Sequence, residues 1–205
     1  MHRAAVLVVA AALLSGCAAL SRGEPQMWFA THNATPPTQS RVVVCHGFGC
    51  HYRTSVGLSA ADLATVRKIL AEGAASPAAE REAIKRLVAH LEKRVAPTVG
   101  SEGDVGGLDM GNAGKRGQMD CIDEAANTTS YLLLAQKRGY LRHHTVGQPV
   151  ARGFFLDGRY PHATAVVHEK ATGVPWAVDS WREANGVPPV VMLLDVWFAE
   201  SPARG

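Results

Sequence analysis

The sequence predicts an α+β fold, and three observations support this. Helix-like patterns dominate the first two thirds of the chain, most strand-like segments follow residue 150, and we find no internal repeat. Helices followed by a run of strands are typical of α+β domains, whereas parallel-sheet folds alternate the two. We therefore expect helices packed on an antiparallel sheet in a single domain.

The first residues have the pattern of an export signal. Arg3 supplies a positive charge, residues 4–14 are apolar, and a leucine, a serine and a glycine then precede Cys17. The apolar run is too short for a transmembrane helix, which needs about 20 residues. We predict a lipoprotein signal peptide over residues 1–16, with Cys17 lipidated; the alternative is an ordinary secretory signal that happens to contain Cys17.

The residues after the signal predict location and domain limits. Ala18, rather than an aspartate, follows Cys17 and favours outer-membrane sorting in a Gram-negative host. We expect a protein of the bacterial cell envelope, held in the membrane by its N-terminal lipid and facing the periplasm. Proline and small polar residues predict a flexible tether over 17–40. Residues 41–205 then form a single domain, with a helical N-terminal part over 41–96.

Composition and charge exclude one class of partner. The chain has a formal net charge of +3 and a pI near 8.8. Its basic residues are scattered and no aromatic residues are interleaved with them, so we expect no nucleic-acid binding.

Three predicted elements lie in the N-terminal half. A β-branched run at residues 41–44 predicts a short strand. Ser59 and Asp62 have the spacing of a capping box and predict a helix over 59–72. A serine–proline pair opens a second helix over 76–95, whose apolar residues recur every three or four positions.

A third helix is predicted to begin at Cys121. Asp120 fits the N-cap position, and the helix is expected to end near Arg138, before a glycine. Six glycines between residues 97 and 117 predict a long loop bordering the site, and no strand precedes them as a phosphate-binding loop would require. Strand-like segments follow the helix at residues 150–156, 163–168, 175–179 and 190–194.

The cysteines point to one reactive thiol. Cys45 and Cys50 are close enough in sequence to close a small disulfide loop in an oxidising compartment, although their redox state stays open. With Cys17 lipidated, Cys121 is the odd cysteine. An unpaired thiol in an exported protein is either intermolecular or reactive.

Cys121, His162 and Asp179 are the candidate catalytic residues. A thiol at a helix start beside an imidazole favours the thiolate, and a carboxylate on the far side would orient that imidazole. If residues 169–172 form a four-residue turn, His162 lies directly opposite Asp179, on the same face of the sheet. A slip of one residue would separate them.

Gln118 is the side-chain candidate for an oxyanion donor, together with the backbone N–H of Cys121. The plainer interpretation of Gln118 is an amide that only stabilises its loop. Both interpretations remain open at the level of sequence.

These residues resemble a known family. Cys121-Ile122-Asp123-Glu124-Ala125, His162-Ala163 and Val178-Asp179 resemble, in order and spacing, the transglutaminase-like branch of papain-fold cysteine enzymes. The resemblance covers roughly residues 110–185. It implies a papain-like core in which the cysteine helix packs on an antiparallel sheet bearing the histidine and aspartate. It also implies thioester chemistry without metal or cofactor, with Cys121, His162 and Asp179 as the triad.

The expected activity is acyl transfer on amide bonds, more specifically that of a peptidase or amidase. Protein or peptide substrates fit an envelope location, and peptidoglycan peptides are one candidate. The alternative is a catalytically inactive lipoprotein that keeps the fold as a binding module. Cys45, His46, Cys50 and His51 also suggest haem or zinc, but the second haem ligand and the separated zinc ligand pairs are missing.

Overall fold

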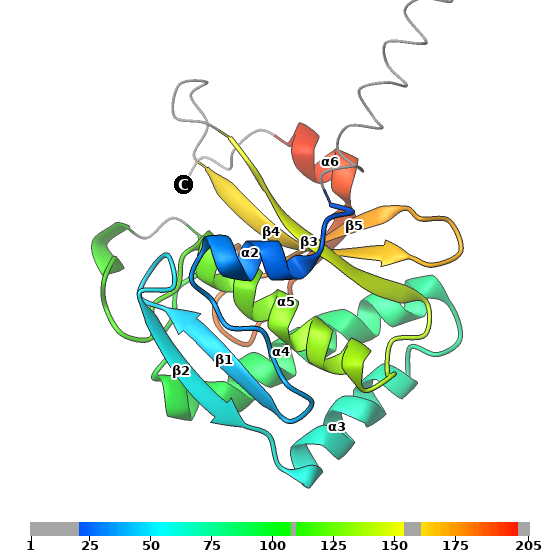
Figure 1. Cartoon of the computed structure of the whole chain (residues 1–205), viewed down its shortest axis with the longest axis horizontal. Helices are drawn as coiled ribbons and strands as arrows, with labels where there is room; N and C mark the ends of the chain where they lie inside the picture. The colour runs from blue at the N-terminus through cyan, green and yellow to red at the C-terminus, as the bar shows by residue number, and fades with distance from the viewer. Residues whose placement is uncertain (1–20, 108–109, 154–160, 201–205) are drawn as a thin grey trace, which may run out of the picture.

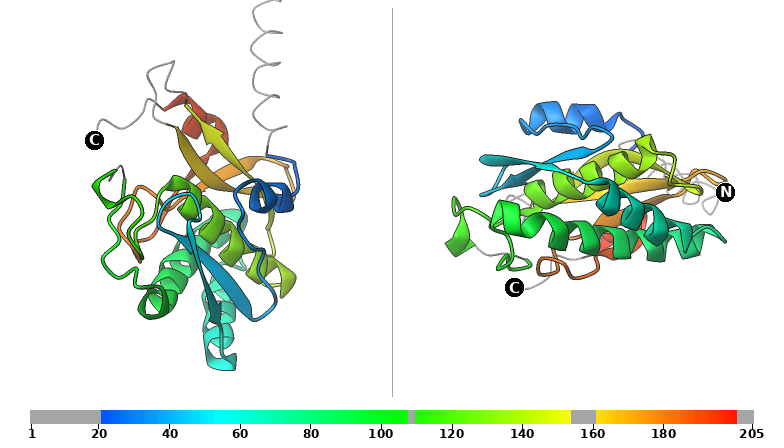
Figure 2. Two further views of the ribbon diagram at one scale, coloured as in Figure 1. Left: turned by 60° about the vertical axis from the view of Figure 1, so that its left-hand side comes forward. Right: turned by 90° about the horizontal axis from the view of Figure 1, so that it is seen from below.

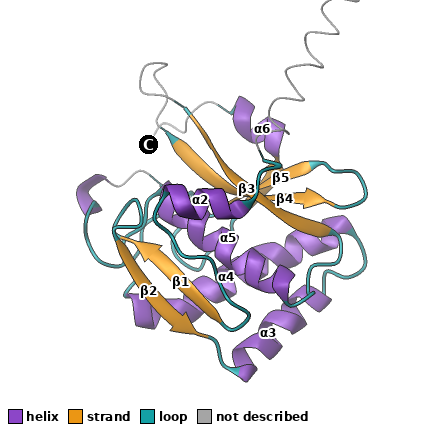
Figure 3. Cartoon of the chain, viewed as in Figure 1, coloured by secondary structure: helices purple, strands orange, loops and turns teal. Residues whose placement is uncertain are grey.

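The computed structural model describes residues 21–107, 110–153 and 161–200. The predicted signal peptide and the lipidation residue Cys17 lie outside the described residues. Within them the chain has a mixed α+β fold, with five α-helices and two antiparallel sheets (Figures 1 and 3). None of the described helices is long and apolar enough to cross a membrane.

The segment predicted as a flexible tether is partly helical. Helix α2 (Pro25–Thr31) begins with a proline at its first position, where the missing N–H has no intrahelical partner to lose. Trp28 and Phe29 on this helix are buried in the main hydrophobic core. The tether prediction is therefore wrong for this segment, because burial of two aromatic side chains outweighs the proline-rich composition around it.

Two strands follow α2 and form a small sheet. Strand β1 (Arg41–His46) pairs with β2 (Tyr52–Gly57) in antiparallel register. The sequence predicts the first strand but not the second, because β2 is mostly polar and only its Val56 is buried. The residues that join β1 to β2 include Cys50, and their N–H groups donate to Asp120 and Asp123 at the start of the helix that begins at Cys121.

Two helices follow this hairpin. Helix α3 (Ala60–Ala71) begins at the predicted capping box, in which Ser59 and Asp62 bond reciprocally. Helix α4 (Pro77–Val99) continues past Pro97 and ends at Gly100, which has a left-handed φ of 82°. The predicted end near residue 95 is therefore too early, because a proline in the last turn removes only one of the helix's hydrogen bonds.

The C-terminal half holds the main sheet and the helix that packs against it. Helix α5 (Cys121–Lys137) contacts both sheets, and Figure 2 shows it near the centre of the molecule. The four strands pair in the order β3-β4-β5-β6 and are all antiparallel. The remaining elements are β3 (His144–Arg152), β4 (His162–Glu169), β5 (Pro175–Asp179), β6 (Val190–Leu193) and α6 (Leu194–Ala199).

The two faces of the main sheet pack against different helices. Ala163, Ala165 and Val167 of β4 belong to the main core with the apolar residues of α5. Val166 of β4 belongs instead to a smaller cluster with Trp197 of α6. Because side chains alternate along a strand, His162 emerges on the α6 face and Ala163 on the α5 face. Cys121 therefore approaches the sheet from the α5 side, at the end of β4 where His162 lies.

Candidate active site

His162 and Asp179 form a buried hydrogen-bonded pair. Nε2 of His162 lies 2.7 Å from Oδ2 of Asp179, and the two residues are 6% and 1% exposed. The predicted register was wrong by two residues. The turn spans residues 170–173, and the N–H of Glu169 donates to the carbonyl of Val174. A shift of two residues keeps the same face, so Asp179 lies diagonal to His162 and still within its reach.

Asp179 is held by two further donors. Nε of Arg182 and the indole N–H of Trp197 donate to the same Oδ2, at 2.7 and 2.8 Å. Burial alone would favour the neutral acid, but the hydrogen bonds from His162 and Trp197 and the charge of Arg182 hold the pKa of Asp179 below its ordinary value. The carboxylate is therefore ionised where it faces the imidazole.

The other nitrogen of His162 is available for chemistry. Nδ1 is buried and has no hydrogen-bond partner among the described residues. The ring packs against two indoles, with Trp181 at 4.4 Å and Trp197 at 5.3 Å between ring centroids. Because the carboxylate of Asp179 accepts from Nε2–H, the favoured neutral tautomer leaves Nδ1 as a proton acceptor.

The thiol of Cys121 lies against the backbone on both sides of His162. Cys121 is the first residue of α5, and Asp120 caps this helix by accepting from the N–H groups of Ile122 and Asp123. Sγ of Cys121 is 3.7 Å from the carbonyl oxygen of Pro161 and also accepts from the N–H of Ala163. The structure thus brings the thiol to His162 but does not join it to the imidazole by a hydrogen bond.

Cys121 is a neutral thiol in this arrangement. Burial, followed by the negative charges of Asp120 and Asp179, raises the pKa of the Cys121 thiol to about 12, although the Ala163 N–H acts in the opposite direction. The thiolate expected from the helix start is therefore disfavoured, because burial and nearby carboxylates outweigh the helix N-terminus. Reaction of Cys121 consequently requires a base.

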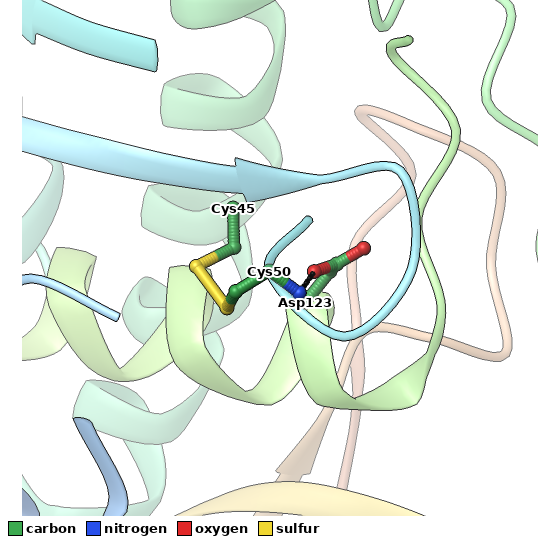
Figure 4. Close-up of side chains that lie close together, drawn as sticks. All are labelled: Cys45, Cys50 and Asp123. Carbon is green, nitrogen blue, oxygen red and sulfur yellow. Dashed lines mark hydrogen bonds between the residues drawn. A yellow bond between two sulfur atoms is a disulfide. The ribbon is translucent and has the colours of Figure 1, made fainter. Parts of the chain in front are cut away.

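Cys45 and Cys50 form a disulfide, as the sequence suggests, and its loop contacts the start of α5 (Figure 4). The N–H groups of Phe48 and Cys50 donate to the carboxylate of Asp123, at 2.8 and 2.6 Å. Burial and the charge of Asp120 raise the pKa of Asp123 to about 8, while these N–H donors lower it. The loop thus supplies the donors that a buried carboxylate beside Cys121 needs.

The backbone of this loop is unusual. Gly47, Phe48, Gly49 and Cys50 all have left-handed φ values, from 56° to 84°. Two of the four are not glycines, so the disulfide and the hydrogen bonds hold a conformation that costs energy. The Gly47 N–H donates to the carbonyl of Gln118 at 2.6 Å, which links the loop to the segment leading into Cys121.

A group of potential metal ligands lies where this loop meets α5. The sulfurs of Cys45 and Cys50 and a carboxylate oxygen of Asp123 lie within 4.8 Å of one another. Both sulfurs are bonded to each other, so neither is a thiolate that a metal would bind.

Gln118, the predicted oxyanion donor, is bonded to the glycine-rich loop. Its Nε2 donates to the carbonyl of Gly103 and its Oε1 accepts from Asn112, both at 3.0 Å. One N–H of the amide group remains for an oxyanion. The structure therefore accounts for Gln118 as a loop amide, and its oxyanion role stays a prediction.

The glycine-rich loop borders the site. The N–H of Gly107 donates to the carbonyl of Trp181 at 2.6 Å. A Cβ at Gly106 would lie 2.5 Å from the backbone carbon of Glu183, so only glycine allows this approach. Both contacts hold the turn that follows Asp179 and carries Arg182.

Arg182 and Trp197 are partners of Asp179 that the sequence pattern does not indicate. Arg182 lies three residues after the aspartate, a spacing that by itself indicates nothing. Trp197 lies on α6, a short helix that the sequence analysis did not predict.

Comparison with protein-family models, with curated proteins and with solved structures found no match. The resemblance to transglutaminase-like enzymes therefore rests on the residues of this chain.

Proposed function

We propose that this chain is a cysteine-dependent acyl-transfer enzyme with a papain-like, transglutaminase-like core. The observation that carries the proposal is the buried His162–Asp179 pair beside the free thiol of Cys121. Helix α5 brings the cysteine to the end of β4, and β4 and β5 supply the histidine and the aspartate. This is the constellation that nucleophilic catalysis on a carbonyl requires: nucleophile, base and a group that orients the base.

The chemical roles follow from the geometry. Nδ1 of His162 has no partner among the described residues and would take the proton of Cys121 as the thiol attacks an amide carbonyl. Asp179 would stabilise the resulting imidazolium through Nε2. His162 would then protonate the departing amine, leaving a thioester on Cys121. Because the resting thiol has a raised pKa, proton transfer accompanies the attack rather than preceding it.

We propose hydrolysis as the outcome, so that water resolves the thioester and the enzyme is a peptidase or amidase. Placement in the cell envelope through a lipid on Cys17 suggests peptide substrates, including peptidoglycan peptides. A non-catalytic binding module is the alternative, and one observation favours it: burial raises the pKa of Cys121 to about 12.

The first test is the pH dependence of alkylation at Cys121 by iodoacetamide, followed by mass spectrometry of the Cys121 peptide. We expect a reactive component between about pH 5 and pH 8 that is lost in His162→Ala. His51→Ala is the matched control, because His51 is exposed in the described structure and lies on the disulfide loop. Alkylation that rises only at strongly alkaline pH, identically in all three proteins, would establish the binding module instead.

The second test separates hydrolysis from transamidation. An activated ester such as p-nitrophenyl acetate would acylate Cys121, and the acyl group can be followed on the Cys121 peptide. Loss of the acyl group to water at the same rate with and without an added primary amine indicates a hydrolase. Transfer to the amine would overturn the hydrolytic assignment but not the acyl-transfer chemistry.

A further inference from the structure

Arg152 lies beside the His162–Asp179 pair. It is directly opposite His162 across strands β3 and β4, so both side chains emerge on the same face of the sheet. The guanidinium carbon lies 4.1 Å from the centroid of the Trp197 ring, and the imidazole of His162 lies 5.3 Å from the same ring. The indole of Trp197 therefore contacts both a guanidinium and the candidate base.

The guanidinium of Arg152 is buried and incompletely bonded. Its side chain is 9% exposed, and Nη2 reaches Oε2 of Glu200 at 3.4 Å. Nη1 is buried and has no hydrogen-bond partner among the described residues. An arginine has five N–H donors, and leaving buried donors of a charged group without acceptors is costly. A site that binds an anion would satisfy them.

The carboxylates around Arg152 are already shared. Asp179 accepts from His162, Arg182 and Trp197 through one oxygen. Glu200 accepts from Arg182 as well as from Arg152. Two guanidinium groups and an imidazole thus face two carboxylates. The distance from Nη2 of Arg152 to Oε2 of Glu200 is the longest among these contacts. The two guanidinium and two carboxylate charges balance, and Nη1 of Arg152 is the guanidinium nitrogen that lacks an acceptor among the described residues.

We propose that Arg152 binds a carboxylate of the substrate, so that the preferred substrates are amides with a free carboxylate next to the scissile bond. This inference rests on the proposed acyl-transfer function and adds the substrate class to it. A guanidinium matches a carboxylate in geometry and in charge, which makes arginine suited to this recognition. Arg152 is paired with His162 across β3 and β4, so a carboxylate bound by Arg152 would lie on the α6 face of the sheet, beside the imidazole.

The test compares two alkylating reagents at Cys121. Iodoacetate and iodoacetamide transfer a methylene group to the thiol by the same displacement of iodide and differ in that only iodoacetate is a carboxylate. We expect the ratio of the iodoacetate rate to the iodoacetamide rate to fall about tenfold in Arg152→Gln, the effect of losing one hydrogen bond to a charged group. An imidazolium at His162 also attracts iodoacetate, so the ratio is compared between proteins at one pH.

Arg86→Gln is the matched control, because Arg86 lies on α4, pairs with Glu72 and is half exposed. It should leave the ratio unchanged. A ratio in Arg152→Gln equal to that of the unmodified protein would overturn the proposal. If Arg152→Gln does not fold, acetate and acetamide are compared in the unmodified protein as protectants of Cys121 against iodoacetamide. Protection by acetate alone supports the carboxylate site, and equal effects of the two overturn it.

Failure of this inference is distinguishable from failure of the proposed function. Iodoacetamide labelling that depends on His162, with a ratio insensitive to Arg152, removes only the carboxylate site. Iodoacetamide labelling that does not depend on His162 removes the acyl-transfer function itself.

Discussion

His162 and Asp179 are diagonal neighbours across β4 and β5, and their side chains meet at 2.7 Å on the α6 face of the sheet. The same carboxylate oxygen accepts from Arg182 and Trp197, so the orientation of the imidazole depends on a turn and a helix outside the strands. Donors from β4, from the turn after β5 and from α6 therefore all bond to one oxygen atom of Asp179.

Asp179→Asn should impair both reactivity and stability. The amide has no charge to stabilise an imidazolium or to pair with Arg182, although its carbonyl oxygen can take the place of Oδ2 and accept from the same three donors. We expect the His162-dependent alkylation of Cys121 to fall roughly 10- to 100-fold. The free energy of unfolding should fall by about 2 to 4 kcal/mol, because the buried guanidinium of Arg182 loses a charged partner and the hydrogen bonds to Asp179 become neutral and weaker.

The measurements for Asp179→Asn are the alkylation rate and the urea unfolding midpoint. Asp195→Asn on α6 is the matched control, since this aspartate is exposed. An unchanged alkylation rate in a folded Asp179→Asn protein would exclude Asp179 from the reaction and leave it a structural role.

Asp120→Asn should make Cys121 more reactive. After burial, the charge of Asp120 is the largest cause of the raised pKa of the Cys121 thiol. Asparagine is as good an N-cap as aspartate, so the substitution removes the charge and keeps the cap of α5. We expect iodoacetamide to label Cys121 several-fold faster at about pH 8, by roughly the factor that one nearby charge contributes.

The control for this prediction is Glu102→Asn, which removes an exposed carboxylate from the loop before α5. The two variants are compared by the Cys121 labelling rate as a function of pH. A labelling rate in Asp120→Asn equal to that of the unmodified protein would mean that the charge of Asp120 does not raise the pKa of Cys121.

Local sequence patterns were sufficient for much of the fold. The capping box at Ser59 and the N-cap at Asp120 predict the starts of α3 and α5, because caps depend on residues close in sequence. Helix α2 was not predicted, because its stability comes from Trp28 and Phe29 packing on residues distant in sequence. Propensity cannot represent such contacts.

The candidate site was predictable in composition but not in detail. The sequence order of Cys121, His162 and Asp179 indicates the three candidate residues. The alternation of side chains along the two strands places the histidine and the aspartate on one face of the sheet. The register itself was two residues off, because hairpin sequence does not determine which residue closes the turn. The raised pKa of Cys121 was also missed, since burial is a property of the packed structure.

The stability of the protein should fall as the pH rises from about 5 to 8. Burial, and then the charge of Asp104, raises the pKa of Glu92 to about 8, although the Gly186 N–H lowers it. Burial and the charge of Glu92 likewise raise the pKa of Glu124 well above its ordinary value. The folded state therefore keeps protons that the unfolded state releases above about pH 4.5, so this contribution is complete below that pH and is lost as the pH rises toward 8.

Glu92→Gln should flatten this dependence. The glutamine can still accept from Gly186 N–H through its carbonyl oxygen, and it has no proton to lose. We expect the variant to gain about 2 kcal/mol of unfolding free energy at pH 8 relative to pH 5, compared with the unmodified protein. Urea unfolding at a series of pH values measures it, with the exposed Glu102→Gln as control; equal slopes in all proteins would contradict the prediction.

The disulfide loop should tolerate substitution at Gly49 better than at Gly47. Both glycines have left-handed φ, so alanine at either position costs about 1 kcal/mol of backbone energy. A Cβ at Gly47 would also lie 2.5 Å from Cδ2 of Tyr52, whereas a Cβ at Gly49 meets nothing within 4 Å. We expect Gly47→Ala to reduce the unfolding free energy by about 1 to 3 kcal/mol more than Gly49→Ala does.

The same pair of variants tests whether the loop supports the reactive thiol. The N–H of Gly47 donates to the carbonyl of Gln118, so movement of the loop away from Tyr52 would disturb the segment that leads into Cys121. Gly47→Ala should therefore slow the His162-dependent alkylation of Cys121, while Gly49→Ala leaves it near the unmodified rate. Equal rates in two folded variants would show that the disulfide loop stabilises the fold without positioning the thiol.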